Sequence, residues 1–472
     1  MLHNAAAAAA AAAGAILAIF ICFHGVSSLN INGDEYIYVN AGWDYVHGDF
    51  TANLEHPPVA KYLFGLAQLV GGQGVVAPRV LVGMLVFAGA AIMFVWLRRE
   101  RGLAAATVAA SLWLLSPRQL DGYRIDRVAL LEPVMMFFAI LAMWLAWRWA
   151  RRQNGHWAAL ASGIAMSLSI TSKVSSLAIL PAFAVLLAIF ARGRRALVGA
   201  GLFAAGLTAT AVAVYVGPRR AGLLYLIQFQ SAHNANGHVV WIAGAAYESA
   251  PWWAHAWYLW LGVGTPMVVV LAVGVGAAIV RLREPLVLFL ASALAGLLVF
   301  YLAVAHVALA FYYYAFMPFL VMLAAIGFAR LLSTRPAPRI GWRGVSAFAL
   351  VVLTAVGVIR LAEQTGAIRP TGIAVVPDVL REHDASGSVL VLAITPNAYL
   401  PYLGAAGTQD ESAGPFSAIV IGTDPRFPPD QALTSALEDE AGLYTLVVED
   451  GVEIWLPPSP VVYGDGSFST PR

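Results

Sequence analysis

The stretch from Asn32 to Lys61 gathers ionisable side chains in a chain that has few of them. Only 11% of the 472 residues are charged, yet this stretch contains Asp34, Glu35, Asp44, Asp49, Glu55, His56 and Lys61. A lysine ammonium is a compact point charge that suits a phosphate group. Carboxylates and such a cation, directly after the first membrane-length apolar run, indicate a site at a membrane surface that could bind a phosphate group.

The acidic pair Asp34–Glu35 has two interpretations. In the first, Asn32 caps a helix, Glu35 takes the third position of a capping box, and the helix dipole favours Asp34. In the second, the following residues form an amphipathic helix that rests on the membrane with one face, made of Tyr36, Val39, Trp43 and Val46. The pair would then lie at headgroup depth, where a lipid-phosphate sugar presents its reactive carbon.

Lysine is rare enough in this chain to be informative. Lys61 and Lys173 are its only two lysines, whereas arginine supplies the basic turns. Both lysines fall at predicted outer ends of helices, where they could bind phosphate. Lys173 could instead extend its ammonium to the membrane surface. His56-Pro57-Pro58, just before Lys61, could be no more than a stiff turn, because two prolines fix the backbone.

The elements that position these residues are membrane helices. The chain is 60% apolar, with a mean hydropathy of +0.74, which is typical of polytopic membrane proteins. The single cysteine, Cys22, excludes a disulfide within the chain and a thiolate metal site. Eleven segments approach the length that a membrane helix needs: 5–26, 77–97, 102–116, 129–150, 157–172, 174–191, 196–216, 257–280, 285–305, 311–332 and 343–362. We interpret the first as an uncleaved helix rather than a signal peptide.

The basic residues predict an orientation, since basic loops stay in the cytoplasm. Arginines cluster in every second turn, at 98–101, 148–152, 192–195, 281–283 and 330–343. In the eleven-helix arrangement all five clusters lie on the cytoplasmic side. The loops 32–61, 117–128 and 217–256 and the tail then lie outside. We therefore predict an integral protein of the cytoplasmic or an ER-type membrane, with its active site on the extracytoplasmic side.

The tail differs from the rest in charge and pattern. Residues 369–472 hold 4 of the 28 basic and 14 of the 26 acidic residues. Apolar runs bounded by Gly, Pro and Asp predict strands at Ser388–Ile394, Ser417–Gly422 and Tyr444–Val448. We predict a helix at Asp430–Glu440 and irregular structure from Pro457 to Arg472. The domains are thus 1–365, the membrane body, and 366–472, a small extracytoplasmic α/β domain.

Several motifs together resemble a known superfamily. Asp34-Glu-Tyr followed by His56-Pro-Pro-x-x-Lys61 resembles the first luminal loop of the GT-C glycosyltransferases, and more narrowly of the protein O-mannosyltransferases and the aminoarabinose transferases. Further segments match in the same order, over about residues 10–330: Arg127 to Glu132-Pro, Ser169 to Lys173, His238 to Trp253, and Phe311 to Pro318. The fold that this implies is a GT-C-like membrane protein with about 11 transmembrane helices.

The resemblance also implies a function. It is inverting transfer of a sugar, with mannose as first choice, from a polyprenyl- or dolichyl-phosphate donor to a hydroxyl of a protein, glycan or lipid. Asp34 would be the base and Glu35 would position the sugar or the base. The phosphate would be held by Lys61 and Arg127, with Lys173 as a further candidate, while Glu132 would orient acceptor or sugar. The mannosyltransferases usually have aspartate at the Glu132 position, which leaves the type of acceptor open.

Further residues are candidates for substrate contact. Arg124 competes with Arg127 for the phosphate and, three positions away, would share a helix face with it. Other charges of this loop, such as Arg118 and Asp121, would form ion pairs. Tyr38, His56 and His238 are candidate substrate-binding residues.

The sequence predicts no metal, no cofactor and no nucleic-acid partner. Phosphate-loop and dinucleotide fingerprints are absent, and no basic-aromatic face suits nucleic acid. Histidines and Glu248 in the 217–256 region, with His255 among them, leave a metal site as an alternative, but their spacing fits no compact ligand motif.

Two functions of other classes compete with the transferase. A transporter or flippase for a lipid-linked sugar would carry charges or helix breaks near the middle of the membrane, whereas the charges here lie toward one face. An inactive scaffold with a sensing tail could keep the same loops.

Overall fold

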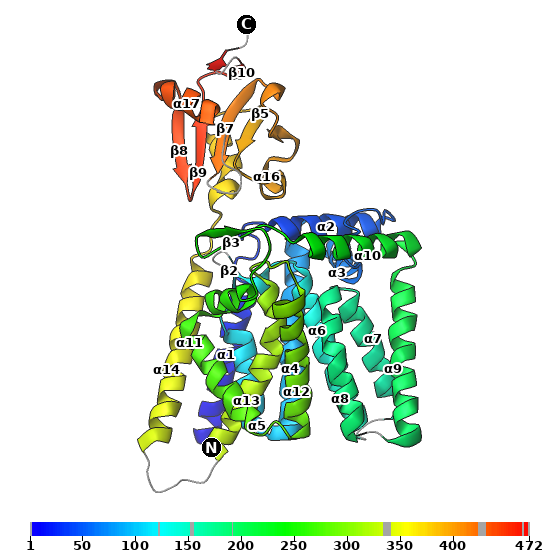
Figure 1. The fold of residues 1–472 in the computed structure, drawn as a ribbon. Helices are drawn as coiled ribbons and strands as arrows, with labels where there is room; N and C mark the ends of the chain where they lie inside the picture. Colours follow the sequence, from blue (N-terminus) through cyan, green and yellow to red (C-terminus); the bar gives the residue numbers. More distant parts are fainter. Residues whose placement is uncertain are drawn as a thin grey trace. The chain divides into compact units, whose positions relative to one another are not determined.

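The computed structural model describes residues 2–120, 123–151, 155–190, 192–333, 341–422, 431–464 and 467–470. The chain divides into two compact units (Figure 1). The first, the helical unit, comprises Met1–Val26 and Tyr38–Ala367. The second, the α/β unit, comprises Ile368–Arg472 together with the short segment Ser27–Ile37. The tail is therefore joined in its own unit by residues from near the N-terminus.

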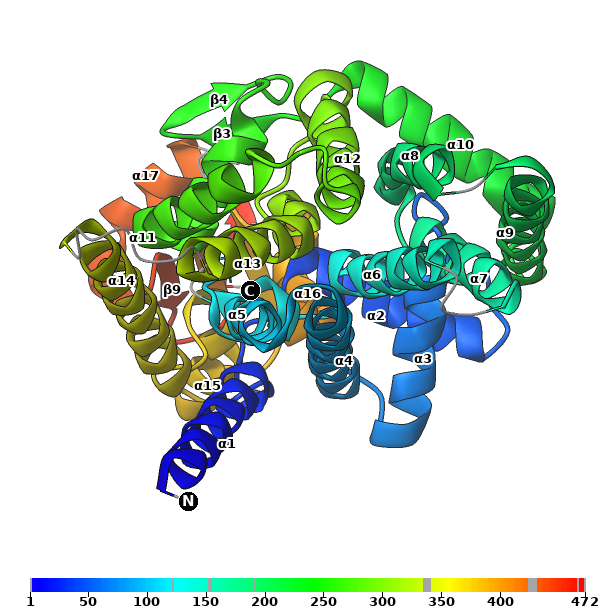
Figure 2. The same cartoon turned by 90° about the horizontal axis from the view of Figure 1, so that it is seen from below.

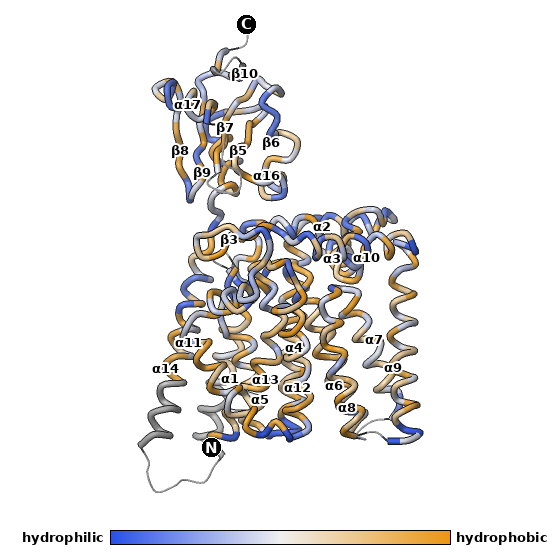
Figure 3. Tube along the Cα trace, in the orientation of Figure 1, coloured by the Kyte–Doolittle hydropathy of each residue, from blue (hydrophilic) through white to orange (hydrophobic). Residues whose placement is uncertain are grey.

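The predicted membrane helices are present in the described part of the helical unit. They are α1 (Leu2–Phe23), α4 (Val76–Arg101), α5 (Leu103–Leu115), α6 (Leu131–Ala150), α7 (Trp157–Ile170), α8 (Leu180–Phe190), α9 (Gly193–Val214), α11 (Ala254–Ile279), α12 (Pro285–Val299), α13 (Met317–Ser333) and α14 (Gly341–Gly366). Each corresponds to one predicted segment, so the prediction of a polytopic helical membrane protein is confirmed. Among the described residues, six helical segments are long and apolar enough to cross a membrane, and the others are shorter apolar helices. Figure 3 shows hydrophobic residues along these helices and hydrophilic residues at their ends.

Shorter elements connect the spanning helices at the end that carries the candidate site. The connecting helices are α2 (Gly33–Val46), α3 (Val59–Gly71) and α10 (Arg219–Asn236). Short turns and strands follow: β1 (Gln119–Leu120), β2 (Tyr123–Arg124), η1 (Ile125–Arg127), η2 (Val174–Ile179), β3 (Val240–Ile242), β4 (Ala245–Tyr247), η3 (Phe300–Val304) and η4 (Tyr312–Phe316). Figure 1 shows α10 running across the ends of the spanning helices rather than along them.

Small residues let neighbouring helices approach closely. At Gly163 of α7 an added Cβ would overlap the carbonyl oxygen of Phe203 in α9, and at Gly206 it would overlap that of Leu160. Glycines at such contacts bring backbones together, which is how helices pack where lipid removes the hydrophobic driving force. Figure 2, which looks along the helices, shows α6, α7 and α9 as neighbours at one side of the unit.

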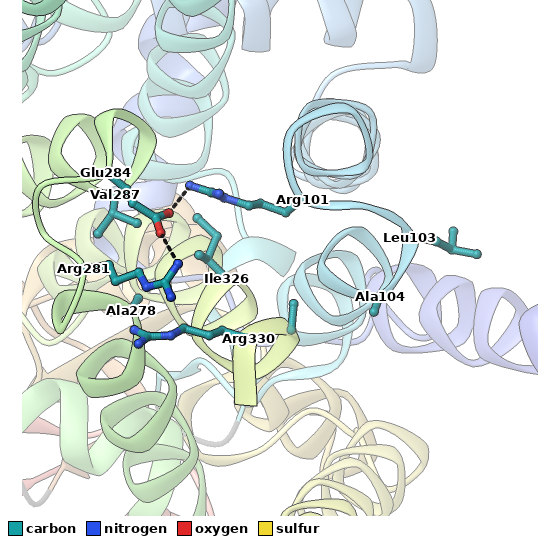
Figure 4. Close-up of a pocket in the computed structure, with 10 residues that line it drawn as sticks. Arg101, Leu103, Ala104, Ala278, Arg281, Glu284, Val287, Ile326 and Arg330 are labelled. Atoms are coloured by element: carbon teal, nitrogen blue, oxygen red, sulfur yellow. Dashed lines mark hydrogen bonds and ion pairs between the residues drawn. The ribbon is translucent and has the colours of Figure 1, made fainter. Parts of the chain in front are cut away.

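The opposite end of the helical unit carries arginines from several turns (Figure 4). Arg101, Arg281 and Arg330 line a cavity of about 350 Å³ together with Glu284. The Glu284 carboxylate accepts from Arg101 at 2.6 Å and from Arg281 at 3.1 Å. Three of the five predicted basic clusters therefore lie at one end of the unit, as the eleven-helix arrangement requires.

The α/β unit is built on a five-stranded sheet in its described part, with strand order β6-β5-β7-β9-β8. Parallel pairing joins β6, β5 and β7, and antiparallel pairing adds β9 and β8. The strands are β5 (Ser388–Leu392), β6 (Gly407–Thr408), β7 (Phe416–Gly422), β8 (Thr445–Glu449) and β9 (Val452–Leu456), and the helices are α15 (Val376–Glu382), α16 (Pro396–Leu403) and α17 (Gln431–Asp439). Apolar clusters cover both faces of the sheet.

The predictions for the tail are confirmed for three strands and corrected at its end. The runs starting near Ser388, Ser417 and Tyr444 form β5, β7 and β8, and α17 covers the predicted helix except Asp430 and Glu440; Asp430 lies outside the described residues. The prediction of irregular structure after Pro457 is wrong, because β10 (Val462–Gly464) and β11 (Ser467–Ser469) pair with each other. Val461 and Phe468 are buried in the core beside β7, and this burial orders the segment.

Candidate active site

The acidic pair lies in the first turn of α2, within the α/β unit. The Asp34 backbone N–H donates to Asn32 Oδ1 at 3.0 Å, and the Asn32 N–H donates to the Glu35 carboxylate at 3.4 Å. This reciprocal pair is a capping box, so the capping interpretation is confirmed. Glu35 is fully buried, whereas Asp34 is partly exposed. Glu35 thus has a structural task, and Asp34 joins the cap through its backbone N–H.

Part of α2 packs closely on α3. Gln68 donates to the carbonyl oxygen of Val39 at 2.8 Å, and Val39 is buried. At the crossing, a Cβ on Gly42 would lie 2.6 Å from the Lys61 carbonyl oxygen, and one on Gly65 would strike the Gly42 carbonyl. The prediction of a membrane-facing surface is therefore wrong for Val39, because α3 covers it. This close crossing holds the backbone of Lys61 against α2.

Lys61 is completely buried in the helical unit. Its ammonium donates to the backbone carbonyls of Asn53 and His56, the latter at 2.8 Å, and lies 4.9 Å from the centre of the Tyr45 ring. Burial lowers the pKa of Lys61 to about 7, since a charged group loses solvation there. Neutral carbonyls are its hydrogen-bond partners, so an anion would find positive charge available at low pH.

His56 links the two lysines. Its ring Nε2 lies 3.3 Å from the Tyr38 hydroxyl, with the rings edge to face. Burial and then the nearby charges of Lys173 and Lys61 hold the His56 pKa well below its usual value. The imidazole is therefore neutral near pH 7. Two predicted substrate residues, Tyr38 and His56, thus contact each other, and the His56 carbonyl accepts a hydrogen bond from Lys61.

Lys173 pairs with Glu132. The ammonium contacts Glu132 Oε1 in an ion pair and lies 3.6 Å from the centre of the Tyr312 ring. Lys173 is buried, so the interpretation that it extends to the membrane surface is wrong. A hydrogen bond of 2.9 Å from the Val59 N–H to the Thr171 carbonyl joins its turn to the start of α3. We call Tyr38, His56, Lys61, Glu132 and Lys173 the lysine cluster.

A second buried cluster, of arginines, lies around Asp126. Arg124 donates to both carboxylate oxygens of Asp126 at 2.8 Å, and Arg118 lies 2.7 Å away. Burial acts to raise the pKa of Asp126, but the two arginines outweigh it and the pKa is lowered. The pairs are buried and lie within one loop, and Asp121 lies outside the described residues. The prediction that Arg124 and Arg127 share a helix face is wrong, because Arg124 is extended and only Arg127 belongs to η1.

Arg127, a predicted phosphate ligand, faces the end of α1. Its guanidinium donates to the His24 carbonyl, and Arg79 of α4 donates to the Val26 carbonyl at 2.6 Å. Together they satisfy carbonyls that follow the last turn of α1. Burial, and then Arg124, lower the pKa of Arg127 to about 10. Its Nε has no partner among the described residues and could still donate to an anion.

Comparisons with known proteins agree on the architecture. A family model for dolichyl-phosphate-mannose-protein mannosyltransferase matches residues 76–198, less than half of the chain. ArnT from Cupriavidus metallidurans, solved with undecaprenyl phosphate bound, is similar over 98% of both chains, with 13% identity and a TM-score of 0.60. The oligosaccharyltransferase of Archaeoglobus fulgidus in the apo form has 12% identity and a TM-score of 0.54, over 83% of this chain and 63% of its own. No curated protein matches in sequence.

The fold is that of the GT-C glycosyltransferases. The similarity to ArnT includes the tail, because it covers nearly the whole of both chains. The sequence resemblance covered the membrane body only. The structural likeness therefore extends the GT-C architecture to the α/β unit, which sequence motifs did not reach.

The structure adds residues that the motifs did not single out as ligands. His255 is 1% exposed, and neither ring nitrogen has a hydrogen-bond partner among the described residues. Its ring lies 4.8 Å from Tyr301 and 6.0 Å from Tyr312, centre to centre. Tyr301 in turn donates to Ser175 at 2.9 Å. A histidine at the start of an apolar helix was the available signal, but its spacing was read only for metal binding.

The 217–256 region also carries His238, another predicted substrate residue. His238 is exposed, and its ring centre lies 5.8 Å from that of His233. Among the described residues, no group of three or more His, Cys, Asp and Glu side chains could hold a metal ion. The role predicted for His238 stays a prediction.

Proposed function

We propose that this chain is an inverting glycosyltransferase that acts on a polyprenyl- or dolichyl-phosphate sugar. The GT-C fold supports the reaction class, and the mannosyltransferase match over residues 76–198 supports mannose as the sugar. ArnT was solved with undecaprenyl phosphate bound, and the Archaeoglobus fulgidus oligosaccharyltransferase AglB was solved with dolichol phosphate bound, which supports a lipid-phosphate carrier here. The acceptor is a hydroxyl of a protein, glycan or lipid outside the cytoplasm.

In the proposed reaction, the acceptor oxygen attacks C1 of the sugar while the bond from C1 to the phosphate oxygen breaks. The hydroxyl proton passes to the Asp34 carboxylate, and the polyprenyl phosphate leaves with the electron pair. Charge grows on the phosphate as an oxocarbenium-like carbon forms, so cations on one side and a carboxylate on the other lower the barrier. One displacement inverts the configuration at C1.

The convergence of the lysine cluster carries this proposal. The only two lysines of the chain lie on turns that contact each other: Lys61 donates to the His56 carbonyl at 2.8 Å, and the Val59 N–H at the start of its helix donates to the Thr171 carbonyl beside Lys173 at 2.9 Å. Lys61 has carbonyl partners that do not neutralise it, so it is our first candidate for the phosphate, with Lys173 beside it. Arg127 is a second candidate through its unpartnered Nε. Arg124 is a weaker one, because Asp126 already occupies its guanidinium.

The other predicted residues take supporting roles in the proposal. Glu35 holds the start of α2 and so positions Asp34. Glu132, His56, Tyr38 and His238 remain proposed substrate contacts. The active site is proposed to face the extracytoplasmic side, because the arginine-rich turns lie at the other end of the helical unit.

The test is sugar release from defined donors in lipid nanodiscs. Wild-type protein is assayed with polyprenyl-phosphate mannose, glucose and aminoarabinose, with product anomers resolved. We expect inverted product from mannose, and Asp34→Asn should lower kcat by about 10²–10⁴. Asp49→Asn is the matched control, since this exposed aspartate also lies in the first loop. Full activity of Asp34→Asn would remove Asp34 from the base role, and no release from any donor would refute the transferase.

A transporter or flippase for a lipid-linked sugar is the alternative. One feature favours it: α11 is interrupted at Gly264, two residues before Pro266, and broken helices occur in transporters. Scrambling of a fluorescent lipid-phosphate sugar between leaflets, with no sugar released, would support that alternative over the transferase.

A further inference from the structure

The segment that leads into Asp34 is held by the tail of the chain. Ser27–Ile37 belongs to the same compact unit as Ile368–Arg472. Residues from near the N-terminus therefore complete the α/β unit, and these residues include the first turn of α2. Asp34 and Glu35 therefore belong to the same compact unit as the tail.

Backbone and side-chain hydrogen bonds fix this segment at two successive residues. The Asn30 amide donates to the Thr371 carbonyl at 3.0 Å and to its hydroxyl at 3.1 Å, and the Thr371 N–H donates back to Asn30 Oδ1 at 3.2 Å. The next backbone N–H, that of Ile31, donates to the Tyr402 hydroxyl at 2.5 Å. Asn32 follows at once and caps α2.

A third contact lies at the first residue of α2. A Cβ added at Gly33 would lie 3.2 Å from the Cβ of Asn397 in α16. That approach leaves no room for a side chain without a small shift. Hence Asn30, Ile31 and Gly33 all meet the tail within four positions of Asp34.

We propose that the α/β unit positions the general base: Asn30, Tyr402 and Asn397 hold the residues that cap α2, and thereby hold the Asp34 carboxylate. This inference rests on the proposed function, in which Asp34 takes the acceptor proton. The three residues are positioning residues and touch no substrate. Releasing them lets the first turn of α2 fray, so the carboxylate spends less time where it can accept the proton.

The contact between Ser27–Ile37 and the tail can be tested without any sugar donor. Gly33→Cys with Asn397→Cys places two Cβ atoms 3.2 Å apart, and a small shift brings them to the separation of about 3.5–4.5 Å found in natural disulfides. The native Cys22 is buried in the helical unit and does not compete. We expect the pair to cross-link in the full-length protein under mild oxidation. Failure to cross-link, while single-cysteine variants fold normally, would overturn the proposal.

Activity then separates positioning from mere folding. The oxidised double-cysteine protein should keep most of the activity of its reduced form, because the lock holds the active arrangement. Tyr402→Phe should lower kcat roughly three- to tenfold with the donor KM unchanged, the size expected for one lost hydrogen bond. Tyr399→Phe, on the same helix and with no hydroxyl contact among the described residues, is the matched control. Unchanged kcat in Tyr402→Phe, or inactivation by the cross-link, would overturn the proposal.

A double-mutant cycle connects the effect to the base. In the Asp34→Asn background, Tyr402→Phe should cause no further loss in the residual rate, because the group it positions is gone. Additive losses would show that Tyr402 acts elsewhere and would refute the positioning role. If the double-cysteine variant cross-links but wild-type protein releases no sugar from any donor, the proposed function fails while the docking of Ser27–Ile37 stands.

Discussion

Lys173 and Glu132 form an ion pair that is almost entirely removed from water, with their side chains 8% and 0% exposed. The second carboxylate oxygen of Glu132 has no partner among the described residues. The pair therefore neutralises charge inside the helical unit and still leaves an acceptor oxygen unused. Such a pair is costly to break from one side, because the remaining charge stays buried.

Removing one member of this pair should destabilise the protein more than removing both charges. Glu132→Gln leaves the Lys173 ammonium without a counter-charge, and we expect a loss of about 3–5 kcal/mol in the free energy of unfolding. Glu132→Gln combined with Lys173→Met should recover most of it. Thermal unfolding in detergent measures both. Equal stability of the single and double variants would contradict the buried pair.

Lys61 should make donor use sensitive to pH near neutrality. Its pKa is lowered to about 7, so the ammonium that binds phosphate is lost as the pH rises through that value. We expect kcat/KM for the donor, which reports the free enzyme, to fall above about pH 7. Lys61→Arg keeps its charge at higher pH, so the decline in kcat/KM should begin at a higher pH in this variant. If the decline in kcat/KM begins at the same pH in Lys61→Arg, it is caused by the titration of another group.

The same group should affect stability with the opposite trend. Between about 7 and the ordinary lysine value of 10.5, the unfolded chain keeps a proton on Lys61 that the folded chain has released. Because the unfolded state then binds more protons, the free energy of unfolding rises with pH over this range. Lys61→Met should abolish that rise in denaturation measured across the range. A slope that persists in Lys61→Met would show that other groups cause it.

Asp126 should be among the most sensitive positions for folding. It is the counter-charge for Arg118 and Arg124, all three being fully buried. Asp126→Asn leaves two buried guanidiniums unpaired, and we expect a loss of at least about 3 kcal/mol. Asp378→Asn breaks an exposed pair with Arg381 and should change stability by well under about 1 kcal/mol. Similar melting temperatures for the two variants would contradict this difference.

Sequence reasoning could predict the helices but not how far-separated segments meet. The apolar runs found α4 and α11 because burial in lipid needs only local composition. The grouping of Ser27–Ile37 with the tail depends on contacts such as that of Asn30 with Thr371, which are 341 positions apart. No local pattern of polar residues in either segment indicates that partner.

The roles of charged residues could also be predicted only in part from the sequence. Arg127 was predicted to bind phosphate, and the structure gives it the His24 carbonyl as a partner. A guanidinium suits the carbonyls at a helix end for the same electrostatic reason that it suits a phosphate. Residue type alone therefore could not separate the two. The capping box of Asn32 and Glu35 was predictable, because a cap is made within one turn of chain.

His255 should lower the free energy of unfolding of the protein when no substrate is bound. Its two ring nitrogens are buried and without partners among the described residues, so His255→Leu should raise the free energy of unfolding by about 1–3 kcal/mol. We also expect lower transfer, because the imidazole beside Lys173 and Tyr312 is free to bond a sugar hydroxyl. Tyr301→Phe, which removes a satisfied hydrogen bond to Ser175, should instead reduce stability. Thermal unfolding and donor kcat/KM measure both effects, and a lower melting temperature for His255→Leu would show that its nitrogens are satisfied in the folded protein.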